Sequence, residues 1–316
     1  MVTVDLRRAP AERWNLSDAQ CRQARELMAT YSKDLGLQPH LSDMLASAAE
    51  GFVRPDHWHE MKAVAQALNV PMSVVVVGNL YYDLAKITLS QLVGCTAFAF
   101  ETGKGTLHAR NLDWWSDNAA LARYTTVNRF VGGPAGEFTT IGWPGFIGAL
   151  SGVAVGRFAV TLNAVLSLEP PQLAAPEVFL LRTVLEEAPS FNAALKILSD
   201  APIPCDCLLL LSGTRPGELA LIERTPTRHA VRWAVDGFVA VTNGYRQLTT
   251  GGSMAPSALL STSCARLDRI EALVQRSRPL TPQDCLAYLS DSEVQMQMTV
   301  QQMVFCASTG EHWLKP

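Results

Sequence analysis

The spacing of apolar positions divides the chain into a helical first third and a longer part in which strands and helices alternate. In residues 15–68, apolar side chains recur with the period of a helix, after the capping residues of Asn15-Leu-Ser-Asp18. This pattern ends at Asn69-Val-Pro71, because proline disfavours helical dihedral angles at the preceding residue. Residues 72–88 are ambiguous. Their valine content favours a strand, whereas their length and leucine spacing favour a buried helix, which we expect.

From Cys95 the pattern changes to short runs that are rich in β-branched and aromatic residues and separated by glycine-containing turns. A loop rich in glycine, serine and proline covers residues 249–257. The order of helices, sheet, helices and sheet suits a sandwich of two sheets flanked by helices. We expect strands at 95–101, 105–113, 124–131, 138–143, 148–154, 156–165, 205–213, 218–225, 228–233 and 238–243, helices at 175–188, 191–201, 264–277 and 285–291, and a closing hairpin of 299–308 with 312–315.

One stretch, residues 146–168, is nearly uncharged and long enough to be read as a membrane span. Several glycines and Arg157 interrupt it, and the runs beside them are short and rich in valine, phenylalanine and threonine. Strands of a buried sheet have this character. We therefore expect strands here and no transmembrane segment.

The composition is that of a globular protein with a large core. Of 316 residues, 48% are hydrophobic and 17% are charged, which allows one large domain or two ordinary ones. The net charge of −3 gives no broad attraction to nucleic acid or to anionic lipid, so we expect neither partner. The first residues carry two arginines but no apolar run of signal-peptide length, which favours a cytoplasmic location.

The cysteines and histidines predict neither a disulfide framework nor a metal site. The cysteines are odd in number and have no repeated CxxC spacing, so most are expected to be small buried thiols. His57 and His59 lack partners at metal-ligand spacing and are expected at a solvated helix end. No metal and no cofactor is therefore predicted.

The strongest chemical signal is a glycine and a cysteine before the first predicted strand. Arg110 and Asp113 close the strand that would return beside it, so a hairpin would bring a cation and an acid back to the thiol of Cys95. A guanidinium beside a thiol favours the thiolate, which is the reactive form. We expect Gly94 to supply the backbone freedom of a sharply turned peptide, and Asn111 to face away from Arg110, because side chains alternate along a strand.

Residues 95–115, CTAFAFETGKGTLHARNLDWW, resemble the segment that begins at the nucleophile of the acid ceramidase and N-acylethanolamine acid amidase family. In that family a cysteine is followed by a strand, a glycine turn and an HxRNxD strand. More distantly, STSCARLDR resembles the Ser-x-Ser-Arg-x-x-Arg segment of bile-salt hydrolases and penicillin V acylases, with Cys264 and Ala265 inserted before the first arginine. The likeness to the first family continues in chain order through VDLRRAPAERW, EMKAVAQALNVPMSVVVVGNLYYDL, GRFAVTLN, RTVLEEAPSFNAALKILSDAPI, VAVTN and VFCASTGEHWLK.

This resemblance implies an N-terminal-nucleophile hydrolase with an α+β fold, a four-layer αββα sandwich of two mainly antiparallel sheets with flanking helices. Such a chain is made as a precursor that cuts itself between Gly94 and Cys95. A helical segment 1–94 and a catalytic domain 95–316 would then form one structural unit, a heterodimer of the chain's own two fragments. Cleavage frees an α-amine, a group whose ordinary pKa of about 7.7 to 8.0 suits a base near neutral pH.

The resemblance also implies catalytic roles on the Cys95 side of the site. Cys95 matches the nucleophile, and Arg110 matches the arginine that stabilises the thiolate or touches the substrate. Asp113 matches the aspartate that holds the amine of the cysteine. The alternative readings are a surface arginine on a strand and an aspartate that caps a turn.

On the oxyanion side, Asn243 in VAVTN and Asn163 in VTLN match the family's donors to the developing negative charge. Arg266 matches the first arginine of the Arg-x-x-Arg pair and would support the same network. The alternatives are turn asparagines and an arginine on a helix surface. Ala164 departs from acid ceramidases, which have glutamate after this asparagine, and so puts that glutamate's role in doubt.

We therefore expect a self-processing cysteine amidohydrolase that cleaves a linear non-peptide amide of an N-acyl compound with an apolar acyl chain, without a cofactor. Trp114, Trp115 and Trp143 are candidates to line the acyl pocket, although tryptophans pack cores as readily. Three alternatives stay open: an N-acyltransferase that uses the same thioester, a hydrolase with bile-salt-like or penicillin V-like substrates, and an uncleaved relative that only binds acylated ligands. The last is kept open by residues 88–94, a link longer than the family's.

Overall fold

The computed structural model describes residues 1–88, 93–103, 105–249 and 258–315. Beyond Thr249, the predicted loop rich in glycine, serine and proline lies outside the described residues, as does most of the link before Cys95.

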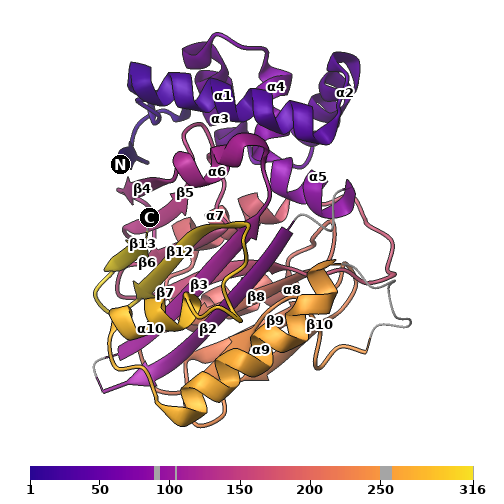
Figure 1. Ribbon diagram of the computed structural model, residues 1–316. Helices are drawn as coiled ribbons and strands as arrows, with labels where there is room; N and C mark the ends of the chain where they lie inside the picture. Colours follow the sequence, from indigo (N-terminus) through magenta and orange to yellow (C-terminus); the bar gives the residue numbers. More distant parts are fainter. Residues whose placement is uncertain (89–92, 104, 250–257, 316) are drawn as a thin grey trace.

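Two sheets stack face to face between layers of helices (Figure 1). Strand neighbours are antiparallel throughout both sheets except for β1 and β4, which are parallel. The first sheet has the order β1 (Val2–Asp5), β4 (Thr126–Val131), β5 (Phe138–Gly142), β6 (Ser151–Ala154), β7 (Phe158–Ala164), β8 (Cys207–Ser212), β9 (Leu219–Arg224) and β10 (His229–Trp233). The second has the order β11 (Phe238–Val241), β2 (Val93–Thr102), β3 (Gly105–Trp114), β12 (Thr299–Cys306) and β13 (His312–Lys315).

The helices form three groups around this sandwich. Helices α7 (Glu177–Glu187) and α8 (Phe191–Asp200) pack on the first sheet, and α9 (Ala258–Arg276) and α10 (Pro282–Leu289) pack on the second. This is the predicted α+β sandwich of four layers. The N-terminal helices gather at one end of it (Figure 1), and their bounds are α1 (Asp18–Leu35), α2 (Pro39–Glu50), α3 (Pro55–Leu68), α4 (Met72–Asn79) and α5 (Tyr81–Thr88), with α6 (Ala120–Arg123) and the 3-10 turns Pro10–Glu12 and Asp117–Ala119 nearby.

Local signals in the sequence account for the helix ends. The Ser17 side chain accepts a hydrogen bond from the backbone of Gln20, whose side chain accepts one from the Ser17 backbone, so a capping box starts α1. Helix α1 ends at Gly36, with φ of 61° in the left-handed region that glycine adopts at low cost. Asn69 ends α3 in the same way, with φ of 51°.

The pattern of strands and helices expected from Cys95 onward is confirmed, and residues 72–88 form helices α4 and α5. The uncharged stretch 146–168 contains β6 and β7. Among the described residues, no helix is long and apolar enough to cross a membrane. Strand β1 was not predicted. The expectation of a solvated His57 is wrong, because this residue is fully buried within α3, where its ring stacks on Phe179 at 5.5 Å.

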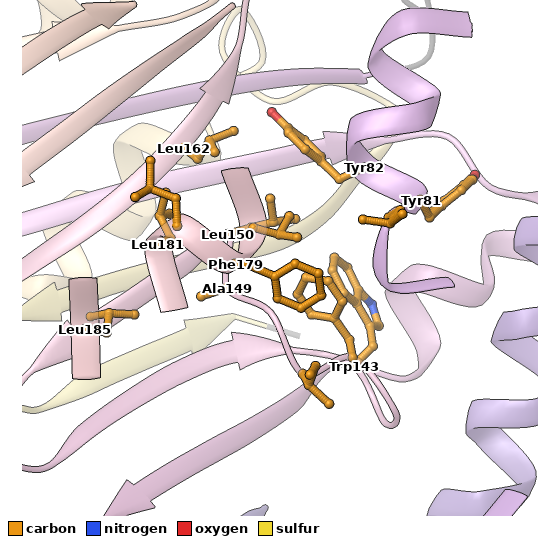
Figure 2. Close-up of a cluster of buried hydrophobic side chains, with 14 of the residues drawn as sticks. Tyr81, Tyr82, Trp143, Ala149, Leu150, Leu162, Phe179, Leu181 and Leu185 are labelled. Atoms are coloured by element: carbon orange, nitrogen blue, oxygen red, sulfur yellow. The ribbon is translucent and has the colours of Figure 1, made fainter. Parts of the chain in front are cut away.

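The largest hydrophobic core lies where the N-terminal helices meet α7 and the first sheet. Figure 2 shows part of it, with Tyr82 of α5 projecting toward Leu162 of the sheet and Tyr81 pointing the other way. Cys95 and Trp114, at adjoining ends of β2 and β3, belong to the same core. The packing of the first third of the chain therefore surrounds the start of β2.

Candidate active site

The hairpin of β2 and β3 divides the candidate residues between two faces of the second sheet. Directly paired residues of an antiparallel ladder project to the same face. Cys95 pairs with Leu112 and Ala97 with Arg110, so Cys95 and Arg110 both face the first sheet. Gly94 pairs with Asp113, and both belong to the opposite face, toward α9. The hairpin thus brings the predicted arginine to the thiol but the predicted aspartate to the other side of the same backbone.

Arg110 is fully buried and donates to the sulfur of Cys95, with 3.3 Å between Nη2 and Sγ. The same nitrogen donates to the Leu162 carbonyl, while Nη1 donates to the Leu150 carbonyl and the Ser151 hydroxyl, each at 2.5 Å. All of these acceptors are neutral. A buried cation is costly unless it is paired, and the Cys95 sulfur is the one of these contacts that can carry a negative charge.

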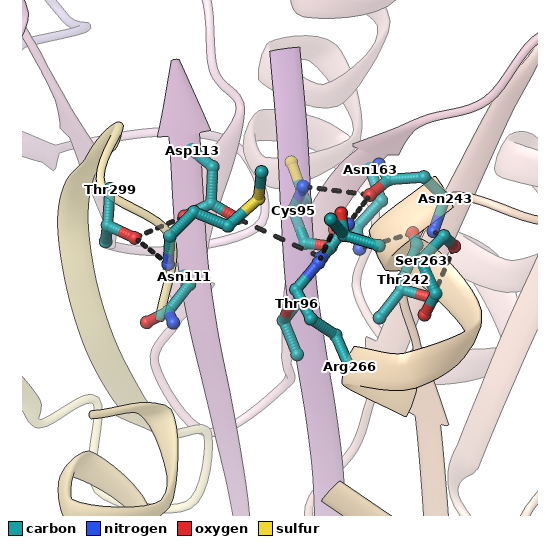
Figure 3. A network of polar contacts seen from close by, with 12 residues as sticks. Cys95, Thr96, Asn111, Asp113, Asn163, Thr242, Asn243, Ser263, Arg266 and Thr299 are labelled. Atoms are coloured by element: carbon teal, nitrogen blue, oxygen red, sulfur yellow. Dashed lines mark hydrogen bonds and ion pairs between the residues drawn. The ribbon is translucent and has the colours of Figure 1, made fainter. Parts of the chain in front are cut away.

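Arg266, on the opposite face, and Asn243, just beyond the end of β11, hold the backbone on both sides of the Cys95 Cα atom (Figure 3). Arg266 Nη1 donates to the Cys95 carbonyl at 2.6 Å and to the Thr96 hydroxyl at 2.8 Å. The Cys95 N–H donates to Asn243 Oδ1 at 3.2 Å, and Arg266 Nη2 donates to the same oxygen at 2.8 Å. Burial lowers the pKa of Arg266, and the arginine is 2% exposed, so the helix-surface reading is wrong.

Asp113 is buried and has one unsatisfied oxygen. Its Oδ1 accepts a hydrogen bond from the Thr299 hydroxyl at 2.5 Å. Its Oδ2 has no hydrogen-bond partner among the described residues and lies 4.0 Å from Arg266 Nη1. Burial raises the pKa of Asp113, although Thr299 and the two arginines oppose this. The carboxyl therefore has spare capacity to accept a hydrogen bond next to the Gly94-Cys95 peptide.

Glycine suits position 94 for a different reason from the one expected. It lies in the regular β2–β3 ladder and not in a sharply turned peptide. A Cβ atom at this position would lie 3.2 Å from Met296 Sδ and 3.3 Å from Asp113 Cβ, both tight contacts. Glycine fits here without a shift of these neighbours, because the backbone and the Asp113 side chain approach each other closely.

The two candidate oxyanion asparagines join the ends of β7 and β11. Asn243 Nδ2 donates to the Ala164 carbonyl at 2.8 Å, and Asn163 Nδ2 donates to the Thr242 carbonyl at 3.0 Å. Each amide nitrogen carries a second N–H. Asn243 also touches Cys95 directly, whereas Asn163 reaches that residue through this linkage. Ala164 contributes its backbone carbonyl to this linkage.

Several residues in this network were not predicted. The Ser263 hydroxyl accepts a hydrogen bond from the Asn243 N–H at 3.0 Å and pairs with the Thr242 hydroxyl at 2.8 Å. Ser263 thereby orients Asn243. Its position in the segment STSCARLDR, close to Arg266, was the feature of the sequence that could have indicated this role. Thr96 and Thr299 carried no such signal, because their partners, Arg266 and Asp113, are distant from them in sequence.

A cavity of about 880 Å³ opens on the Arg266 side of the Gly94-Cys95 peptide. Its walls include Trp114, Trp115, Met296 and Met298, with Arg266 and Thr299 at the end that adjoins the network. Trp143 does not line it. That tryptophan packs in the core, edge-on to Trp114 at 6.1 Å, and its Nε1 donates to the Leu121 carbonyl. The Cys95 side chain, on the inner face of the sheet, is fully buried.

Among the residues that the structure describes, no three or more histidine, cysteine, aspartate and glutamate side chains gather in a way that could hold a metal ion. Cys205 and Cys207 are buried free thiols, as the sequence indicated. The candidate site is thus built from a thiol, two guanidinium groups, a carboxyl and amides.

The four-layer fold places a buried cysteine at the start of an interior strand of the second sheet. Residues 100–304 match the family described as acyl-coenzyme A:6-aminopenicillanic acid acyl-transferase, and the chain belongs to that family.

Curated relatives support the resemblance seen in the sequence. The chain is 28% identical over 189 residues to acid ceramidase of Homo sapiens, covering 52% of this chain and 46% of the ceramidase. It is 26% identical over 251 residues to the N-acylethanolamine-hydrolyzing acid amidase of Cavia porcellus, covering 74% and 68% of the two chains. The chain spans less than two thirds of the length of the acid ceramidases that it matches.

Solved structures support the fold. A Caenorhabditis elegans orthologue of N-acylethanolamine-hydrolyzing acid amidase superposes with a TM-score of 0.56 at 18% identity, covering 70% of this chain and 100% of the other. A mutant conjugated bile acid hydrolase from Clostridium perfringens superposes with a TM-score of 0.50 at 14% identity, covering 70% and 88%.

Proposed function

We propose that the protein is a self-processing cysteine amidohydrolase that cleaves the linear, non-peptide amide of an N-acyl compound through a thioester on Cys95. The observation that carries the proposal is the bond from Arg110 to Cys95 Sγ, because it gives a buried thiol a cation that has only neutral acceptors elsewhere. The names of the curated relatives, acid ceramidase and N-acylethanolamine-hydrolyzing acid amidase, support the amide as the bond that is cleaved.

Self-cleavage at Gly94-Cys95 requires only water as a reagent. The Cys95 sulfur attacks the Gly94 carbonyl carbon, and the C–N bond breaks as the Cys95 nitrogen takes up the proton given by the thiol. Water then hydrolyses the thioester and leaves a carboxyl on Gly94 and a free thiol and amine on Cys95. The spare Oδ2 of Asp113 and the Oδ1 of Asn243 support this step, because both are acceptors placed for the new ammonium group.

The same groups support turnover of a substrate. The freed amine of Cys95 takes the thiol proton, the thiolate attacks the substrate carbonyl, and the amine returns the proton to the leaving nitrogen. An N–H of Asn243 or Asn163 stabilises the oxyanion, after a small rotation of either side chain. Water resolves the acyl-thioester to the free acid. The wall of tryptophans and methionines in the 880 Å³ cavity suits an apolar acyl chain.

We propose that fragments 1–94 and 95–316 stay together as one unit after cleavage. Three interactions across the cut support this. Strand β1 pairs with β4, the buried Lys86 Nζ contacts Glu177 Oε2 at 2.8 Å, and Arg182 contacts the buried Glu60 at 3.3 Å. Separating the fragments would expose buried charges and a shared core, which is costly.

Turnover of a panel of N-acyl amides, varied in acyl length and headgroup, tests the proposed function. We expect release of free acid and amine, and an acyl adduct on the peptide that begins with Cys95. The Cys95→Ala variant should show neither, whereas Cys264→Ala, which removes an exposed thiol, should behave as wild type. Turnover retained by Cys95→Ala, or no turnover of any substrate by wild type, would disprove the proposal.

A second candidate function is transfer of the acyl group to an amine. The description of the matched family as an acyl-transferase favours it. The thioester on Cys95 is the same, but an amine resolves it in place of water. Adding an amine acceptor to the assay separates the two reactions: a transferase yields mainly the new amide, whereas a hydrolase yields mainly the free acid.

A further inference from the structure

Tyr82 of α5 is a buried phenol that has no role in the reaction steps proposed above. Its side chain is 1% exposed, and its hydroxyl has no hydrogen-bond partner among the described residues. The ring packs edge-on to Trp114 at 5.3 Å, and Lys86 Nζ lies 5.5 Å from the ring centroid. A buried hydroxyl without a partner costs free energy, which a phenylalanine at this position would not.

The Tyr82 hydroxyl is directed toward Leu162, whose carbonyl is an acceptor for Arg110. Figure 2 shows it pointing away from α5, toward Leu162 of the first sheet. The carbonyls of Leu162 and Leu150 are the groups that hold the Arg110 guanidinium beside Cys95 Sγ. Tyr82 and Cys95 belong to the same hydrophobic core. The unpaired hydroxyl therefore faces Leu162, whose carbonyl holds the guanidinium that contacts Cys95 Sγ.

Charged and titratable groups from four elements act on Tyr82. Burial raises the pKa of its hydroxyl well above the ordinary value, and a thiolate on Cys95 raises it further. Lys86 and Arg110 oppose these effects, and Glu177 of α7 adds to them. Tyr82 therefore remains a neutral phenol at physiological pH, which can donate a hydrogen bond to an anion.

We propose that the Tyr82 hydroxyl donates a hydrogen bond to the Cys95 sulfur in its thiolate form, as a second donor beside Arg110. This inference rests on the proposed role of Cys95 as the nucleophile. Because Tyr82 lies before the cleavage point, fragment 1–94 then takes part in positioning the nucleophile after cleavage. Hydrogen bonds to a charged acceptor stabilise the charged form, so Tyr82 lowers the pH at which the thiolate forms.

Tyr82→Phe tests this proposal, with Tyr81→Phe as the matched control. Both variants remove one hydroxyl from α5. The Tyr81 hydroxyl contacts Asp34 at 2.8 Å, away from Cys95, and its ring stacks on Trp114. The pH midpoint of thiolate formation is read from ultraviolet absorbance, as the difference between each variant and the same variant carrying Cys95→Ser.

For Tyr82→Phe we expect the thiolate midpoint to rise by about one pH unit, a tenfold effect, with unchanged or higher thermal stability. The kcat/KM at neutral pH should fall about tenfold and recover at higher pH. Tyr81→Phe should keep the wild-type midpoint. A Tyr82→Phe midpoint equal to wild type, or a wild type that forms no Cys95 thiolate, would overturn the proposal. The titration of Cys95 does not depend on turnover. If the Tyr82→Phe variant has a shifted thiolate midpoint but the wild type cleaves no amide, the proposed function is wrong and the hydrogen bond from Tyr82 is still supported.

Discussion

Arg110 Nη2 lies 3.3 Å from Cys95 Sγ across the β2–β3 hairpin, and the other acceptors of this guanidinium are two carbonyls and a hydroxyl. A second arginine, Arg266, contacts the carbonyl of the same cysteine from the opposite face of the sheet. One cation therefore serves the side chain of Cys95 and the other serves its backbone.

The first prediction concerns Arg110→Lys. A single ammonium group cannot reach the Leu150 carbonyl, the Leu162 carbonyl and the sulfur together, whereas the guanidinium contacts all three. We expect kcat to fall about a hundredfold or more, with the fold retained by circular dichroism. Arg129→Lys, at an exposed ion pair with Glu137, is the control and should keep wild-type activity. Near-normal turnover by Arg110→Lys would contradict the role given to this residue.

The second prediction concerns Asp113→Asn, in which activity and stability change in opposite directions. The variant keeps an acceptor for Thr299 but presents an NH₂ group where Oδ2 could accept from the Cys95 ammonium. We expect turnover to fall about tenfold to a hundredfold.

The stability of Asp113→Asn follows from the raised pKa of the buried carboxyl. A carboxyl whose folded-state pKa is raised contributes stability below its ordinary pKa, and this is lost as pH rises through the raised value. At neutral pH the carboxylate therefore destabilises the fold. In a Cys95→Ala background, the asparagine variant should be at least as stable as its parent in urea unfolding. A clear loss of stability would show that Asp113 is mainly structural.

The third prediction concerns the cavity. Ala122 of α6 lines it, so Ala122→Trp should fill part of its volume. We expect kcat/KM for long acyl chains to fall about tenfold or more, while short chains stay within about twofold. Ala48→Trp, on the exposed side of α2, controls for an added tryptophan. If acyl-length preference is unchanged, the acyl chain binds elsewhere.

The fourth prediction concerns His108, which lies between the two sheets. Its ring nitrogens contact Ser212 and Thr161, each at 2.9 Å, and burial together with Arg110 lowers its pKa from 6.5 to about 3. The folded state therefore excludes a proton that the unfolded chain binds. The stabilising contribution of neutral His108 is complete above pH 6.5. Below pH 6.5, the free energy of unfolding falls by about 1.4 kcal/mol per pH unit.

Urea unfolding in a Cys95→Ala background measures this dependence. His108→Asn should be less stable at neutral pH and should lose less stability on acidification to about pH 5. The pKa of Glu186 is lowered from 4.5 to about 2. This carboxyl therefore changes the pH dependence of stability only below pH 4.5, outside the range that is compared here. His312→Asn, at a half-buried histidine, should retain most of the dependence. If the free energy of unfolding changes equally with pH in His108→Asn and in its parent, His108 is not the cause of the pH dependence.

Local patterns in the sequence were sufficient to predict the strand hairpin and the residues at its centre. Residues three apart on a strand face opposite ways, so Arg110 and Asp113 could not both reach the thiol, and Asp113 lies beside the backbone instead. Ser263 and Tyr82 act through contacts with segments distant in sequence, which no local period encodes. Composition also could not separate Trp143, a core residue, from Trp114 at the cavity.

Intact mass of the purified protein, for wild type and Cys95→Ala, tests the central claim most directly. Cys95→Ala removes the sulfur but keeps the strand and the small size of the site. We predict two wild-type fragments whose masses correspond to residues 1–94 and 95–316, and one uncut Cys95→Ala chain. A wild-type protein that turns over an N-acyl amide as a single uncut chain, or a cut at the same bond in Cys95→Ala, would contradict the account.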